Sequence, residues 1–362
     1  MEAAPRLTTR RSFLALAALA AGLPLPARAA DTPAVPDTLG IDAAADLLDQ
    51  AAAEGRFATA AAAARRIEEA VLPLDRPLGE PDTPLPPRVR KALVRALAVP
   101  DAGLQFAAAR TLALTAGPPP WPGSSRVVEA IAHAATATGS DRAVVAHHDA
   151  DVAHEIAAGV SRFGYRPVVV STGRAAVLAA REHADTVLVI LGARIIRPSA
   201  FEASQFIQEQ PFGDIPPVLV VIDPFDDLAR GRFLTRSILS YSGLRCVTLV
   251  DRMESFFQPA LDPDTGKEVS PARFPAALED LTGVDAASAD ARAARAALRM
   301  ERGRQAATLL AILERRGWGI PDSACARVDR TSALLDPSGY NRPASTLPPP
   351  AADDAALPEP TR

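Results

Sequence analysis

The feature that most constrains the fold is a regular alternation of apolar runs and helical patterns between residues 141 and 250. Five short runs rich in Val, Ile and Leu recur there, namely RAVVAHHD, RPVVVST, DTVLVIL, PPVLVVID and RCVTLV. Amphipathic helical patterns separate them. Strands that alternate with helices form parallel sheets, and continuously apolar runs are typical of strands buried on both faces. The sequence therefore predicts an α/β domain with a five-stranded parallel, doubly wound sheet.

Helical patterns without such strands flank this domain on both sides. Alanine-rich stretches and apolar residues at helical spacing predict several helices before it. Six prolines interrupt them between Pro73 and Pro87. After it, one long helix closed by Gly317 forms a C-terminal arm that would pack back on the N-terminal helices. The expected parts are a linker with alanine-rich helices over 31–72, a proline-rich linker over 73–87, a helical region over 88–139, the α/β domain over 141–257, an irregular segment and the long helix over 258–331, and a disordered tail over 332–362.

The first thirty residues have the composition of an export signal. Arg10 and Arg11 precede a short apolar segment, and Ala27-Arg28-Ala29 offers a small-x-small cleavage site. This pattern resembles a twin-arginine signal, and a Sec signal that happens to contain two arginines is the alternative. The apolar segment is too short to span ~30 Å of hydrocarbon. We therefore expect an exported, periplasmic protein without a stable membrane span after the signal is removed.

The overall charge bears on the class of partner. The formal net charge is −4 and the pI is about 5.8. A broad nucleic-acid-binding surface requires clustered cations, so we expect no nucleic-acid partner.

Residues 141 to about 255 resemble a response-regulator receiver domain. The likeness lies in the order and spacing of RFGYRPVVVSTGRAAVLAAREHADTVLVIL and of GDIPPVLVV, which match the segments from the first receiver helix to the third strand and the entry to the fourth strand. The resemblance implies a CheY-like, flavodoxin-like fold. It also implies a phosphoryl-transfer site built from an acidic pair, an acceptor aspartate, a hydroxyl and a lysine.

The residues at these receiver positions cannot perform that chemistry. The acidic pair falls on His147 and His148, or includes Asp149 if the alignment shifts by one. The acceptor position falls on Ile190 and the hydroxyl position on Val221. The lysine position falls on Val250 or Asp251. Isoleucine has no nucleophilic atom, valine cannot bond a phosphoryl oxygen, and imidazoles are poor Mg²⁺ ligands. The resemblance therefore implies a receiver-like domain that has lost its switch.

One helix pair in the N-terminal region resembles a HEAT repeat. The residues that carry the likeness are Asp101, Leu104, Gln105, Ala108, Ala109 and Leu112. Gln105 stands where that pattern usually has arginine. Only this pair matches, whereas at least three repeats are usually needed to bury a continuous core. A generic helical hairpin is the alternative interpretation.

Two further hypotheses place a ligand at the carboxyl edge of the sheet. His147, His148, Asp149 and His154 are close in sequence and could form a Zn²⁺ or Ni²⁺ site, as in a metal-binding protein or a metal-dependent hydrolase. Adjacent strand residues point to opposite faces, however, so the two histidines converge only if the strand has already ended. The alternative is a polar loop at the rim. The same edge could also bind a small molecule, as in a sensor.

The leading hypothesis is a non-catalytic interaction or scaffold protein that needs no cofactor. A protein partner or self-association is expected. By the receiver resemblance, the contact surface would be LARGRFLTRSILSYSG, over residues 228–243, together with the chain that follows Val250.

Overall fold

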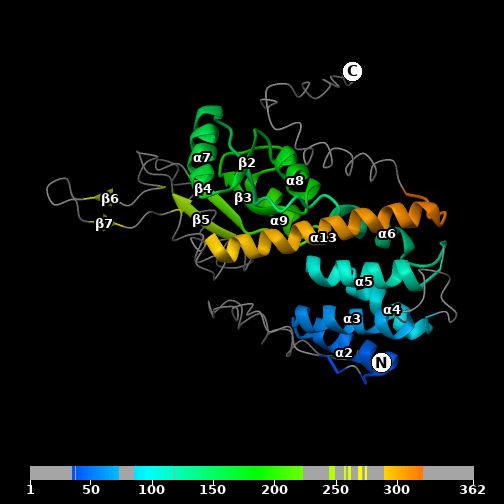
Figure 1. Ribbon diagram of the computed structural model, residues 1–362. Helices are drawn as coiled ribbons and strands as arrows, with labels where there is room; N and C mark the ends of the chain where they lie inside the picture. Colours follow the sequence, from blue (N-terminus) through cyan, green and yellow to red (C-terminus); the bar gives the residue numbers. More distant parts are fainter. Residues whose placement is uncertain are drawn as a thin grey trace, which may run out of the picture.

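A computed structural model gives the arrangement of the chain (Figure 1). The structure describes residues 38–72, 85–117, 119–222 and 289–320, and also residues 35–36, 244–248, 257, 260–261, 268–270 and 274. The expected signal residues Arg10, Arg11 and Ala29 lie outside the described residues. So do Val250, Asp251, the segment 228–243 and the tail 332–362.

A parallel sheet forms the centre of the part that we call the α/β unit. Its strand order is β2-β1-β3-β4-β5, and all neighbouring strands are parallel. The strands are β1 (Arg142–Ala146), β2 (Arg166–Val170), β3 (Thr186–Gly192), β4 (Val218–Ile222) and β5 (Leu244–Thr248). The prediction of an α/β fold with a parallel sheet is confirmed for β1 to β4. The fifth strand, β5, pairs with β4, and only its backbone is described.

Helices cover both faces of the sheet, as strands that are apolar throughout require. Val144, Val189 and Val220 face a core that α8 (Gly173–Glu182) and α9 (Ala200–Gln208) complete. The alternate strand residues face the other side of the sheet, where α7 (Ala150–Arg162) covers them. Phe257 and Phe274 belong to this second core.

The helices before the sheet form a second body, which we call the helical unit. They are α2 (Ile41–Ala53), α3 (Phe57–Val71), α4 (Pro87–Ala96), α5 (Ala102–Thr115) and α6 (Ser124–Ala134). Their shared core consists largely of alanine and leucine, and small alanine side chains let the helices approach closely. A serine cap from Ser124 or Ser125 is the expectation from the sequence for α6, and the structure differs. Gly123 precedes the helix with a φ of 94°, and no side chain caps it.

The long helix α13 (Ala289–Arg315) lies along both units (Figure 1). Its 27 residues span about 40 Å at 1.5 Å per residue. The C-terminal half buries Ala306, Leu309 and Leu313 in the core of the helical unit, as expected for an arm that packs back. Leu298, in the other half, is 67 % exposed. None of the described helices is long and apolar enough to cross a membrane.

The irregular segment between the sheet and α13 contains a short antiparallel pair. β6 (Ala260–Leu261) pairs with β7 (Glu268–Ser270). The residues between these two strands lie outside the described residues.

Candidate functional site at the carboxyl edge of the sheet

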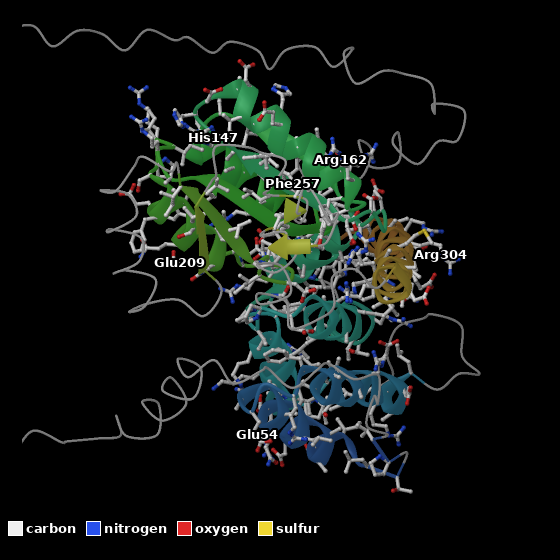
Figure 2. The ribbon with its side chains drawn as sticks, turned by 90° about the vertical axis from the view of Figure 1, so that its left-hand side faces the viewer. Glu54, His147, Arg162, Glu209, Phe257 and Arg304 are labelled. Carbon is white, nitrogen blue, oxygen red and sulfur yellow. The ribbon has the colours of Figure 1, made fainter. Side chains whose placement is uncertain are left out.

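The carboxyl ends of β1 and β3 meet at one edge of the α/β unit. Ligands of open parallel sheets bind at this edge, where the strand order reverses. His147 follows β1 directly, and Gly192 ends β3. Figure 2 shows His147 close to the start of α7. This is the place where the sequence predicted receiver-like or metal-binding residues.

The ring of His147 fills the space at this edge. It is 2 % exposed, and its Nδ1 accepts a hydrogen bond of 3.1 Å from the backbone N–H of Asp149. A Cβ on Gly192 would lie 2.3 Å from Cδ2 of His147, well inside van der Waals contact. The ring therefore takes the room that a side chain at position 192 would need. The ring of the exposed His148 lies beside it, with 4.5 Å between centroids.

Ile190 lies inside the sheet and not at its rim. Its side chain is completely buried, and it packs with Val145 and Leu219 in the core beneath α7. Two more residues of β3 follow it, so Gly192 holds the last position of β3 on that face. Ile190, whose assignment to the acceptor position stays a prediction, therefore lies two residues before this edge. The edge position has no side chain at all.

Val221 pairs in register with Gly192 and is buried in the same core. Its carbonyl accepts a hydrogen bond of 2.8 Å from the N–H of Ala193. The residue predicted for the hydroxyl position is therefore a buried hydrocarbon side chain.

Asp149 and His154, two residues of the metal hypothesis, each bond to the backbone of α7. Asp149 caps α7, and its Oδ1 accepts hydrogen bonds from the N–H groups of Asp151 at 2.9 Å and Val152 at 3.3 Å. These two bonds lower the pKa of Asp149, because they stabilise the carboxylate. His154 turns back toward the carbonyl of Ala150, 2.6 Å from its Nδ1.

The two histidine rings of the metal hypothesis do meet, because β1 ends at Ala146 and both histidines follow it. Within the described parts of the chain, no group of three or more His, Cys, Asp or Glu side chains is placed to hold a metal ion.

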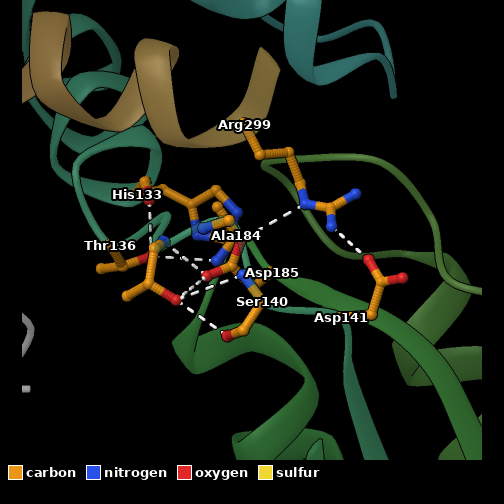
Figure 3. Close-up of polar contacts among 9 residues, drawn as sticks. His133, Thr136, Ser140, Asp141, Ala184, Asp185 and Arg299 are labelled. Carbon is orange, nitrogen blue, oxygen red and sulfur yellow. Dashed lines mark hydrogen bonds and ion pairs between the residues drawn. The ribbon is translucent and has the colours of Figure 1, made fainter. Parts of the chain in front are cut away.

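A second polar cluster lies at the opposite, amino edge of the sheet (Figure 3). Asp185 precedes β3 and is completely buried. Its carboxylate accepts hydrogen bonds from the backbone N–H and the hydroxyl of Thr138 and, at 3.2 Å, from the N–H of Gly139. The Nε of Arg299, from α13, lies 3.3 Å from its Oδ1. The same guanidinium pairs with Asp141. A buried carboxylate requires this full set of partners.

Gln105 joins the helical unit to the α/β unit. This buried α5 side chain donates through Nε2 to the carbonyls of Leu97 at 3.3 Å and Pro211 at 3.1 Å. Its Oε1 accepts from the N–H of Gly213 at 2.7 Å. The neighbouring Asp214 accepts from the N–H of Ala102 at 3.0 Å. The residue that departs from the HEAT pattern therefore bonds the loop that follows α9.

A small cavity lies where these contacts meet. Its lining includes Gln105, His133, Arg299 and Arg302, and its volume is about 10 Å³. That is room for one water molecule. The described side chains that line this cavity are therefore closely packed.

The sequence interpretation missed this junction. A signal was present in α13, where Arg292, Arg295, Arg299 and Arg302 recur at spacings of three and four and so share one face of the helix. Arg292 donates to the carbonyl of Phe163, and Arg299 reaches Asp141 and Asp185. An arginine stripe on a helix is usually solvated, so the spacing alone did not indicate that this one is partly buried.

Comparisons with protein-family models, curated proteins and solved structures found no match.

Proposed function

We propose that this chain is an exported, non-catalytic scaffold protein whose α/β unit has a receiver-like fold without the phosphoryl switch. The strand order β2-β1-β3-β4-β5 supports the likeness, because doubly wound sheets of the flavodoxin and receiver type have this order. Export is proposed from the paired arginines Arg10 and Arg11 and the cleavage pattern that ends at Ala29.

The observation that carries the proposal is the filled carboxyl edge. Phosphoryl transfer requires a nucleophile with oxygen ligands for Mg²⁺ beside it. At this edge the ring of His147 occupies the space over Gly192, and Ile190 and Val221 belong to the core. The nearby carboxylate of Asp149 caps a helix. Ile190 and Val221 offer neither a nucleophile nor an oxygen ligand to a phosphoryl group, and the ring of His147 is almost completely buried.

The junction supports a scaffold role for the chain. Receivers that switch must shift between two arrangements. Here α13 and the loop after α9 tie the amino edge of the sheet to the helical unit through Asp185, Arg299 and Gln105. Breaking one partner of a buried charge pair costs about 3–5 kcal/mol. A unit held in this way presents fixed surfaces to a partner.

The proposal is tested by phosphoryl transfer to the purified full chain. The protein is incubated with Mg²⁺ and ³²P-labelled acetyl phosphate, beside an ordinary receiver that serves as a positive control. We expect the control to incorporate acid-labile phosphate and this chain to incorporate none. Stoichiometric acid-labile label that maps to residues 141–257 would overturn the proposal.

A further inference from the structure

The outer faces of α8 and α9 carry two stripes of opposite charge and identical spacing. On α8 the stripe is Arg174, Leu178 and Arg181. On α9 it is Glu202, Phe206 and Glu209. In each stripe a charged residue, an apolar residue four positions later and a second charge three positions further share one helix face. Arg174, Leu178, Glu202, Phe206 and Glu209 are exposed, and Arg181 is half-buried. Figure 2 shows Glu209 on the outside of the α/β unit.

Backbone and side-chain contacts show that the two stripes lie side by side. The N–H of Arg174 donates to the carbonyl of Arg197, just before α9, at 2.9 Å. Near the other end, the guanidinium of Arg181 donates to the carbonyl of Phe206. Both helices follow strands of one parallel sheet and cover the same face of it, so they run in the same direction.

The apolar centres of the stripes are unusually open to solvent. Leu178 is 59 % exposed and Phe206 is 46 % exposed. Ile196 extends the surface at the start of α8, where its carbonyl accepts from the N–H of Gly173. Large apolar side chains that are framed by charges are typical of contact surfaces.

We propose that this α8–α9 face, defined by the two stripes, binds the same face of a second copy of the chain. A two-fold axis that runs parallel to the helices and between them places α8 of one protomer over α9 of its partner. The helices then run in the same direction, each arginine stripe faces a glutamate stripe, and Leu178 packs near Phe206 of the other protomer. An axis across the helices would instead set arginine against arginine, which costs free energy.

The size of the surface sets the strength of the dimer. A helix of ten residues is about 15 Å long, and two neighbouring helices are about 20 Å wide. The area is therefore well below the ~800 Å² per partner of a standard stable interface. The dimer is reversible and dissociates as the salt concentration rises, because exposed charges are screened.

Sedimentation velocity of the full chain tests this inference. The protein is studied from about 1 to about 500 µM, at about 50 and about 500 mM NaCl. We expect a monomer–dimer equilibrium that is weaker at the higher salt concentration. Leu178→Glu is expected to raise the dimer Kd by at least about tenfold. Leu298→Glu, which changes a leucine on α13 that is 67 % exposed, serves as the matched control and leaves the Kd unchanged.

Charge reversal gives an independent readout. Glu209→Arg sets like charges against each other and is expected to raise the Kd. Adding Arg181→Glu in the same chain restores opposite charges in exchanged positions and lowers the Kd again. Circular dichroism melts verify that each variant is folded. A chain that stays monomeric over the whole range overturns the inference, as does a dimer that neither Leu178→Glu nor Glu209→Arg weakens. A monomer that binds a different protein through this face also overturns it.

This inference rests on the proposed scaffold function and names a second copy of the chain as the partner. The two proposals can fail separately. If the chain is monomeric and takes up no phosphate, the dimer proposal is overturned and the scaffold proposal stands. If the chain is dimeric and is phosphorylated within residues 141–257, the scaffold proposal is overturned and the dimer proposal stands.

Discussion

At the scale of single residues, glycine and histidine together define the carboxyl edge of the sheet. Gly192 makes room for the buried ring of His147, and the ring in turn fills the volume that an acceptor side chain would need. Burial and a hydrogen bond hold the ring in this position. His147 is almost completely buried, and its Nδ1 is bonded to the backbone of Asp149. The buried ring therefore leaves no room for an acceptor side chain at position 192, in addition to the absence of an aspartate at Ile190.

Gly192→Ala tests this packing. The added methyl group meets the His147 ring at 2.3 Å, so the ring or the strand must move. We expect a loss of about 1–3 kcal/mol in the free energy of unfolding, measured by urea denaturation. Gly319→Ala is the control, because nothing lies within 4 Å of its Cβ position. Equal stability of the Gly192→Ala protein and the control would contradict the packing described.

At the scale of elements, the helical unit combines apolar packing with an ion pair whose carboxylate is largely buried. Glu68 of α3 pairs with Arg110 of α5 at 3.0 Å, and its side chain is only 13 % exposed. Its second oxygen, Oε2, is buried without a hydrogen-bond partner in the described structure. Burial raises the pKa of Glu68 above its ordinary value of 4.5, although the charge of Arg110 opposes that rise.

Glu68 therefore makes the stability of the chain depend on pH. Its pKa is higher in the folded protein, so the folded state holds the proton more tightly than the unfolded chain does. The contribution is complete below 4.5 and is lost as the pH rises through the folded pKa. We expect the wild type to lose stability relative to Glu68→Gln between about pH 4 and about pH 7, measured by urea denaturation at each pH. A relative gain over that range would contradict the burial of this carboxylate. Glu69→Gln controls for the loss of one negative charge.

At the scale of the whole molecule, α13 makes two bodies into one. Its arginine stripe bonds the turns at the amino edge of the sheet, and its apolar half completes the core of the helical unit. Close packing accompanies the charges. A Cβ on Gly303 would lie 2.3 Å from the carbonyl of Ala137, and one on Gly139 would lie 2.9 Å from the carbonyl of Ala296. Charge and contact together fix α13 against the turn before β1.

Arg299→Leu tests this coupling. The variant leaves the buried Asp185 without its cation, which is expected to cost about 3–5 kcal/mol. Because Arg299 joins α13 to the α/β unit, scanning calorimetry is expected to show one transition for the wild type and two for the variant. Arg304→Leu is the control. Arg304 is exposed and pairs only with Glu301 among the described residues, so its loss is expected to leave the midpoint of unfolding nearly unchanged. A single transition of unchanged midpoint in Arg299→Leu would contradict the role of this pair.

The sequence by itself determined the local structure, because the signals for it are local. The period of apolar residues defined the strands and helices, and Asp149 is the kind of residue that caps a helix. The sequence also excluded a nucleophile at Ile190 and Val221. The apolar run DTVLVIL predicted β3 through Leu191, and the structure extends the strand by one residue to Gly192.

Only the tertiary structure decided which distant groups meet. Asp185 and Arg299 are 114 residues apart, and Gln105 and Gly213 are 108 apart. A carboxylate before a strand and an arginine on a helix are both compatible with solvent until the chain is folded. The matching stripes on α8 and α9 are likewise visible in the sequence only once the sheet shows that the two helices are neighbours. Burial and charge pairing depend on which residues are close in space, and local sequence patterns do not show which distant residues those are.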